Sequence, residues 1–169
     1  MDLGSSYAPS ELVGSLLLAQ LDARTSTLAR RRRLFEAYEQ GLAPLVARGV
    51  VDTIRVPADR TTNYQMFWLL VRDAEERAGL LAHLDALGIA AAFHYVPLHG
   101  APYARSLGMD VRLPVTERQA ARLVRLPFYT AITEPEQLRV VDALGAFWGI
   151  AARAPPASPR DRTILGTAG

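Results

Sequence analysis

The chain has 169 residues, 50% of them hydrophobic and 21% charged, with a formal net charge of +2, which is ordinary for a soluble protein with one hydrophobic core. No stretch approaches the roughly 20 consecutive apolar residues of a transmembrane helix, and the first residues lack the basic and apolar regions of a secretory signal. The absence of cysteine excludes disulfides and thiolate metal sites, and a cytoplasmic location is expected.

Residues 9–45 are expected to be helical. Apolar residues recur at three- and four-residue spacing from Leu12 to Ala23, which indicates an amphipathic helix, and Pro9 suits its first turn. The run of hydroxyl residues at 25–27 is a poor helix interior, so we expect a break or bend there. A second helical stripe follows it, made of Leu28, Phe35, Tyr38, Leu42 and Leu45.

Four consecutive arginines, residues 30–33, lie in the first turns of the second helix. Consecutive helical residues point about 100° apart, so these side chains do not form one basic face. They are interpreted as a solvated surface with scattered ion pairs. A nucleic-acid-binding arm is the alternative, but no aromatic residue interleaves with the arginines and the net charge is close to neutral.

Two strands are predicted next, near residues 53–56 and 65–71. The second is an almost continuous apolar run, which is typical of a central strand. Asp73, with Glu76 three residues later, forms a capping box that starts a helix over 74–87.

A third strand is predicted at residues 91–95, because a short apolar run ends at Pro97, which has no N–H to give to a sheet. This strand carries His94 and Tyr95 to its C-terminal end, and His99 follows on the next loop. Two imidazoles and a phenol beside a proline-stiffened loop suit a pocket for a polar ligand. The alternative is that each histidine is merely hydrogen-bonded within the fold.

The remaining elements are two helices and a tail. Capping boxes beginning at Thr116 and Thr133 predict helices over 117–124 and 134–148. The proline-containing tail, residues 151–169, has little to bury and is expected to be disordered. The element order predicts an α+β fold: a small, mostly antiparallel sheet with helices on one face and long N-terminal helices leading in.

The run FHYVPLHG, residues 93–100, resembles a signature of the DegT-like nucleotide-sugar aminotransferases, which use pyridoxal phosphate (PLP). Within that family it is most similar to the dTDP-4-amino-4,6-dideoxygalactose transaminase branch. The resemblance runs from Asp2 to Trp148. It implies that residues 1–150 are the C-terminal part of such an enzyme, comprising long linking helices and the small domain of a fold-type I PLP-dependent transferase.

The resemblance also implies a reaction and a set of site residues. The family moves an amino group from glutamate to a dTDP-4-keto-6-deoxy sugar, with PLP as cofactor, in a homodimer. His94, Tyr95 and His99 would contact the nucleotide sugar. In many members a loop asparagine reaches the PLP phosphate of the neighbouring subunit, and Ser6 stands at that position here; its hydroxyl can still donate to phosphate. Alternatively, Ser6 is only a helix-start hydroxyl.

One departure from the family bears on catalysis. All 19 basic residues are arginines, so the chain has no lysine to hold PLP as a Schiff base. Arginine cannot replace it, because the guanidinium stays protonated. We expect no catalytic residue and no activity in this chain alone. A stand-alone, non-catalytic interaction module derived from the family is the alternative, and the sequence leaves open whether Met1 is a true start.

Overall fold

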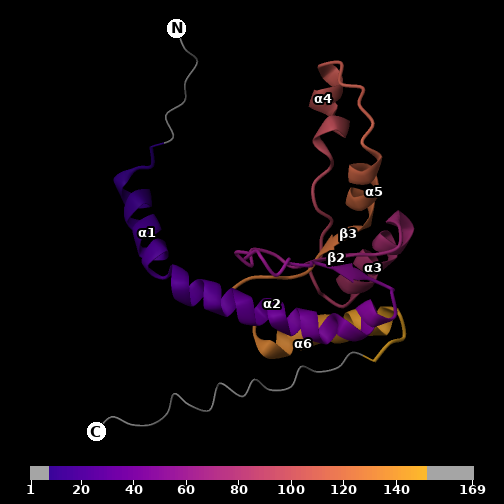
Figure 1. Cartoon of the computed structure of the whole chain (residues 1–169), viewed down its shortest axis with the longest axis horizontal. Helices are drawn as coiled ribbons and strands as arrows, with labels where there is room; N and C mark the ends of the chain where they lie inside the picture. The colour runs from indigo at the N-terminus through magenta and orange to yellow at the C-terminus, as the bar shows by residue number, and fades with distance from the viewer. Residues whose placement is uncertain (1–7, 152–169) are drawn as a thin grey trace.

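The computed structural model describes residues 8–151, in which helices surround a small sheet (Figure 1). No helix in this range is both long and apolar enough to cross a membrane. Ser6 and residues 152–169 of the predicted tail lie outside the described residues. In chain order the elements are α1 (Glu11–Asp22), α2 (Arg24–Ala47), β1 (Asp52–Thr53), β2 (Trp68–Leu70), α3 (Ala74–Ala86), η1 (Leu98–Gly100), α4 (Pro102–Ser106), α5 (Pro114–Arg122), β3 (Leu123–Arg125) and α6 (Glu134–Phe147).

The predicted N-terminal helical region is two helices, α1 and α2, that meet at Ala23. The break therefore lies two residues before the hydroxyl run at 25–27 that the sequence favoured. The first helix starts at Glu11 rather than Pro9, with Ser10 as its N-cap: the Ser10 side chain accepts a hydrogen bond from the Val13 N–H at 3.4 Å. Within α1 no residue is buried, so its predicted amphipathic face has no partner in the described part of the chain.

The sheet of the described region has three antiparallel strands in the order β1-β2-β3. The predicted strand at residues 91–95 is wrong: only Ala92 joins the sheet, through an isolated bridge to Arg125. The third strand is instead β3, a segment that the sequence placed partly in a helix. Alanine is a poor strand former, whereas Val124 is fully buried opposite Leu69, so packing favours β3.

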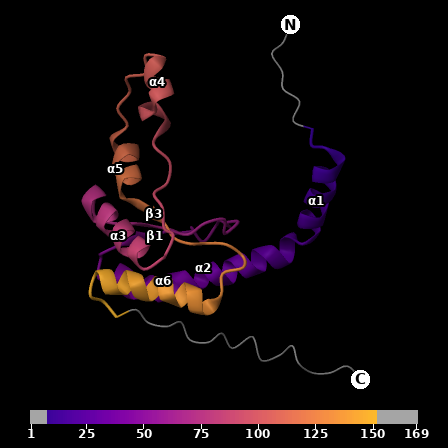
Figure 2. The same ribbon diagram turned by 180° about the vertical axis from the view of Figure 1, so that it is seen from behind.

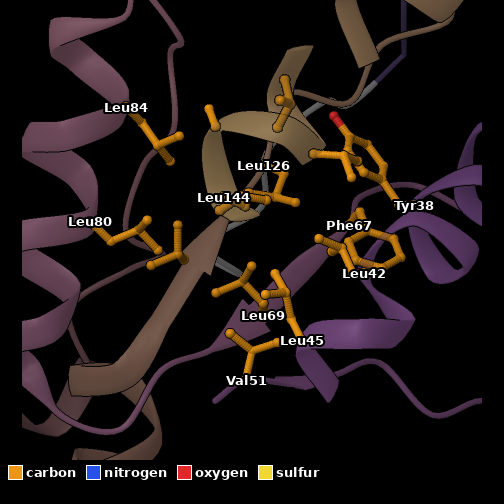
Figure 3. Packing of buried hydrophobic residues seen from close by; sticks show 14 of the residues in the cluster. Tyr38, Leu42, Leu45, Val51, Phe67, Leu69, Leu80, Leu84, Leu126 and Leu144 are labelled. Carbon is orange, nitrogen blue, oxygen red and sulfur yellow. The ribbon is translucent and has the colours of Figure 1, made fainter. Parts of the chain in front are cut away.

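The hydrophobic core lies between the sheet and helices α2, α3 and α6 (Figure 3). Phe67 packs against Tyr38 and Phe35 of α2, with its ring centroid 4.9 Å from that of Phe35. The Tyr38 hydroxyl donates to the Pro127 carbonyl at 2.8 Å, which ties α2 to the chain beyond β3. Leucines of α3 and α6 complete the core. These contacts confirm the predicted α+β architecture.

One of the three predicted capping boxes is present, at Thr133: its side chain accepts from the Glu136 N–H, and its own N–H donates to the Glu136 carboxylate. Asp73 caps α3 by accepting from the Glu76 N–H, but the box is incomplete, because the Glu76 carboxylate accepts from the Arg72 N–H instead. The box predicted at Thr116 is wrong, because α5 already begins at Pro114. Proline suits the first helical position, where an N–H would have no partner.

Arg30, the first arginine of the run 30–33, has a structural role. Its guanidinium donates to the carbonyls of Thr130 and Ile132 at 3.3 and 2.7 Å. Arg32 pairs with Glu36 at 2.7 Å on the exposed surface. These contacts agree with a helix surface carrying scattered ion pairs, and they anchor α2 to the loop before α6.

Two parts of the chain project from the core. Helix α1 extends beyond the end of α2, and residues 93–122, which we call the arm, carry α4 and α5 away from the sheet (Figure 1, Figure 2). In both views α1 and the arm stand on the same side of the layer formed by α2 and α6. Both bear exposed apolar side chains: Leu12, Leu16 and Leu18 on α1, and Val96, Leu98, Leu107 and Val111 on the arm.

Candidate functional site

A cleft of about 730 Å³ lies along the arm. The residues that line it come from the loop after the Ala92 bridge, from α3, from the α4 region and from α5. They are mixed in character: aromatic and aliphatic side chains alternate with two arginines, a histidine and two carboxylates. The polar members are Arg77, Tyr95, His99, Arg105, Asp110 and Glu117, and the apolar ones include Phe93, Val96, Met109 and Val111.

The cleft brings together two of the three site residues chosen from the sequence around FHYVPLHG. Tyr95 and His99 line it, whereas His94 does not. Phe93 and Tyr95 both face the cleft while the residue between them does not, in keeping with the alternation of side chains along extended chain. The His94 ring lies 4.6 Å from the Tyr95 ring, and its Nδ1 is buried with no hydrogen-bond partner in the described residues.

His99 is held by a carboxylate from α5. Its Nε2 lies 3.1 Å from Oε1 of Glu117, and the same oxygen accepts a hydrogen bond from the Leu113 N–H at 3.0 Å. The pKa of Glu117 is lowered from its ordinary value, first by the Leu113 N–H and next by His99. The carboxylate therefore stays ionised and joins the turn of η1 to the start of α5.

The cleft also holds two guanidinium groups. Arg77 of α3 donates to the Ala120 carbonyl at 2.8 Å and lies over the Phe93 ring, with Cζ 5.9 Å from the ring centroid. Arg105 of α4 is exposed, and its guanidinium makes no hydrogen bond or ion pair within the described part of the chain. Arg105 is therefore a guanidinium available to a ligand, in a cleft whose two arginines are matched by the carboxylates of Asp110 and Glu117.

Sequence reasoning missed four of the six polar members of this cleft: Arg77, Arg105, Asp110 and Glu117. Arg77 and Arg105 stand in helices without any motif, and no pattern linked them to the FHYVPLHG run. The sequence placed Glu117 in a capping box that starts at Thr116. In the structure its carboxylate instead accepts from the Leu113 N–H and pairs with His99. Its contact with His99 spans 18 residues, so only the folded arm reveals it.

The cleft offers groups that can bind a polar ligand. Guanidinium groups can bind phosphate oxygens, while the histidine and tyrosine can exchange hydrogen bonds with hydroxyl groups. The cleft has no amine nucleophile, because the sequence has no lysine. Among residues 8–151 no three His, Asp or Glu side chains come together as a metal site.

Comparisons with known proteins place the chain in a family and match its fold. A family model described as the DegT/DnrJ/EryC1/StrS aminotransferase family matches residues 1–145. The aminotransferase TlmJ from Streptoalloteichus hindustanus has a similar structure, with a TM-score of 0.69 and 27% identity over 78% of this chain and 34% of TlmJ. DesV from S. venezuelae gives a TM-score of 0.68 and 30% identity over 82% of this chain and 36% of DesV.

Relatives of lower identity share the fold. The putative sugar aminotransferase Spr1654 from Streptococcus pneumoniae, solved in its PLP form, gives a TM-score of 0.62 and 24% identity over 77% of this chain and 33% of that protein. The chain thus spans about a third of the length of these solved relatives.

Proposed function

The chain belongs to the DegT/DnrJ/EryC1/StrS aminotransferase family, and from this we propose that it supplies the C-terminal portion of a sugar aminotransferase. The complete enzyme would move an amino group from glutamate to a dTDP-4-keto-6-deoxy sugar. The observation that carries this proposal is the cleft, where Arg105 and His99 offer an anion-binding group and a hydroxyl-binding group to one ligand. A nucleotide sugar presents both kinds of group.

Pyridoxal phosphate is the cofactor of the family, and Spr1654 has been solved in its PLP form. The residues of this chain do not fit covalent attachment of that cofactor, because they include no lysine. We therefore assign the attachment of the cofactor to a lysine-bearing large domain outside this sequence. The contribution proposed for this chain is to bind and orient the sugar substrate.

The exposed apolar side chains indicate where that domain docks. The solved relatives are about three times as long as the matched region, so a body of about two thirds of their length is available as the occupant. Helix α1 and the arm stand on the same side of the core (Figure 1) and both expose leucines, including Leu12, Leu16 and Leu98. Such a surface is large for a protein without a partner. We assign it to the large domain.

Within the cleft, Arg105 would bind the diphosphate, and Tyr95 and His99 would contact sugar hydroxyls. His94 does not line the cleft and would act through the Tyr95 ring that it touches. Ser6 would donate to the PLP phosphate of a neighbouring subunit in a homodimer. The FHYVPLHG run supports dTDP-4-amino-4,6-dideoxygalactose as the product, and the absence of cysteine supports a cytoplasmic location.

The test is to fuse this chain to the lysine-bearing large domain of a solved relative and to measure the two half-reactions separately. Arg105→Ala should impair amination of the 4-keto sugar nucleotide and leave the glutamate half-reaction nearly unchanged. Arg118→Ala, on an exposed position of α5 outside the cleft, is the matched control. Equal losses in both half-reactions would remove Arg105 from the sugar site.

A second candidate is a stand-alone, non-catalytic interaction module, which the missing lysine and the exposed leucines would also suit. The DNA immediately 5′ of this reading frame discriminates between the two. A coding segment for a lysine-bearing large domain there supports the aminotransferase. An unrelated neighbouring gene favours the module.

A further inference from the structure

Glu117 joins two segments of the arm through a single oxygen. Its Oε1 accepts from His99 on η1 at 3.1 Å and from the Leu113 N–H at 3.0 Å. The His99 side chain is only 12% exposed, while that of Glu117 is 47% exposed. The His99 imidazole is therefore mostly buried at the wall of the cleft, and its contact with the Glu117 carboxylate sets its orientation.

The chemistry of the two partners fixes where the imidazole proton lies. An ionised carboxylate can only accept hydrogen bonds, so the histidine nitrogen that faces it must carry a proton. In neutral His99 that nitrogen is Nε2, which leaves Nδ1 with a lone pair. Nδ1 has no hydrogen-bond partner in the described part of the chain and is not among its buried unpartnered atoms.

We propose that Glu117 is a positioning residue that holds His99 in the Nε2–H form, so that Nδ1 accepts a hydrogen bond from a hydroxyl group of the ligand in the cleft. A keto or phosphate oxygen can only accept hydrogen bonds, so it cannot form one with this unprotonated nitrogen. The pair therefore selects a hydroxyl-bearing sugar ring, while Arg105 takes the anionic part of the same ligand. The ligand assignment rests on the proposed function; the tautomer does not.

The tautomer is measured by long-range proton–nitrogen NMR on the full, nitrogen-15-labelled chain at about pH 8, above the ordinary histidine pKa of about 6.5. The sequence has only three histidines, so each can be assigned. His83 is an internal standard, because its Nε2 lies 3.0 Å from the Ala143 carbonyl and must carry the proton. We expect His99 to match His83. An Nδ1–H form, or a free-histidine mixture, overturns the proposal.

Variants separate positioning from folding. Glu117→Ala should release His99 into a mixture of tautomers, and Glu117→Gln, which keeps an acceptor oxygen, should restore much of the Nε2–H form. Arg118→Ala is the control and should change neither. If Glu117→Ala does not fold, Glu117→Gln decides. A native amide spectrum with the Nε2–H form kept supports the proposal, and a native spectrum with a mixture of His99 tautomers overturns it.

Titration with dTDP-glucose tests the ligand side. Binding should shift the His99 Nδ1 resonance, and Glu117→Ala should weaken binding by roughly 2–10-fold, the loss of one hydrogen bond. A mixed His99 tautomer in the wild-type chain overturns the role of Glu117 whether or not the nucleotide binds. An Nε2–H form with no response to dTDP-glucose overturns the ligand-facing role and counts against the proposed function, while the tautomer assignment stands.

Discussion

Gly41 of α2 lies directly against Val141 of α6. A Cβ placed on Gly41 would be 3.0 Å from both methyl carbons of Val141, although the glycine sits in the middle of a helix. The two helices pack side by side there (Figure 2), and the missing side chain allows their close approach. Gly41 is thus retained at a cost in helix propensity of about 1 kcal/mol relative to alanine.

Gly41→Ala should therefore destabilise the fold by about 1–2 kcal/mol. The gain in helix propensity is smaller than the cost of overpacking, since buried valine has one strongly preferred rotamer and cannot move both methyl groups away. The measurement is the urea unfolding midpoint.

Two variants check that reasoning. Gly79→Ala is the matched control: its new Cβ would meet Phe147 at an ordinary 3.7 Å, so it should stabilise α3 slightly. Val141→Ala should relieve the clash, so that Gly41→Ala becomes neutral or favourable in that background. A stabilising Gly41→Ala in the wild-type chain would contradict the packing argument.

Tyr38→Phe should cost about 1–2 kcal/mol at neutral pH, because the partly buried Pro127 carbonyl loses its donor. Burial raises the pKa of Tyr38 well above its usual value of 10.0, so the folded state binds the phenol proton more tightly than the unfolded state. The protonated phenol therefore adds to the free energy of unfolding. This contribution is complete below about pH 10 and is lost as the pH rises further. Urea unfolding as a function of pH should reveal this loss in the wild-type chain and a smaller one in Tyr38→Phe. Tyr103→Phe, on an exposed side chain, should behave like the wild type.

Thr133→Ala should destabilise the fold by about 1 kcal/mol, because the Thr133 side chain caps α6 by accepting from the Glu136 N–H, while the Thr133 N–H donates to Glu136 Oε2 at 2.8 Å. Thr116→Ala removes a threonine of the same local sequence pattern that caps nothing in the structure, so it should change stability by less than about 0.5 kcal/mol. Thermal unfolding of both variants provides the comparison. Equal losses at the two positions would contradict the assignment of the caps.

Replacing Leu12 and Leu16 together by serine should reduce self-association of the isolated chain and leave its unfolding midpoint nearly unchanged. Both side chains are exposed and lie one helical turn apart on α1, so no core contact is lost. Sedimentation analysis across a concentration series measures the effect. Gln20→Ser on the same helix is the control. A wild-type chain that stays monomeric at every concentration would show that α1 does not mediate self-association.

Incubation of the purified chain with PLP, followed by borohydride reduction and digestion, should place no pyridoxyl group on an internal residue. The sequence has no lysine, and only the N-terminal α-amine, with a pKa of about 8, can condense with free cofactor. The chain alone should also fail to aminate a 4-keto sugar nucleotide with glutamate. A label on an internal residue, or such activity, would show that the chain contains a catalytic group of its own.

The sequence by itself determined the parts of this protein that depend on local chemistry. Helix caps at Asp73 and Thr133 follow from side chains that satisfy N–H groups three residues away, and the helical stripe that includes Tyr38 and Leu42 follows from the 3.6-residue period. The absence of lysine is also a property of the sequence alone. It excludes a Schiff base between PLP and a side chain, whatever the fold.

Only the tertiary structure decided which short segments form the sheet and which side chains share the cleft. The run at 91–95 and the segment at 123–125 are both short and apolar, and the second became β3 because Val124 is buried against Leu69. Arg105 and Glu117 share the cleft with His99 and Tyr95 because the arm folds back along itself, and Arg77 joins them from α3. Contacts across 18 or more residues depend on packing, which no local period or spacing encodes.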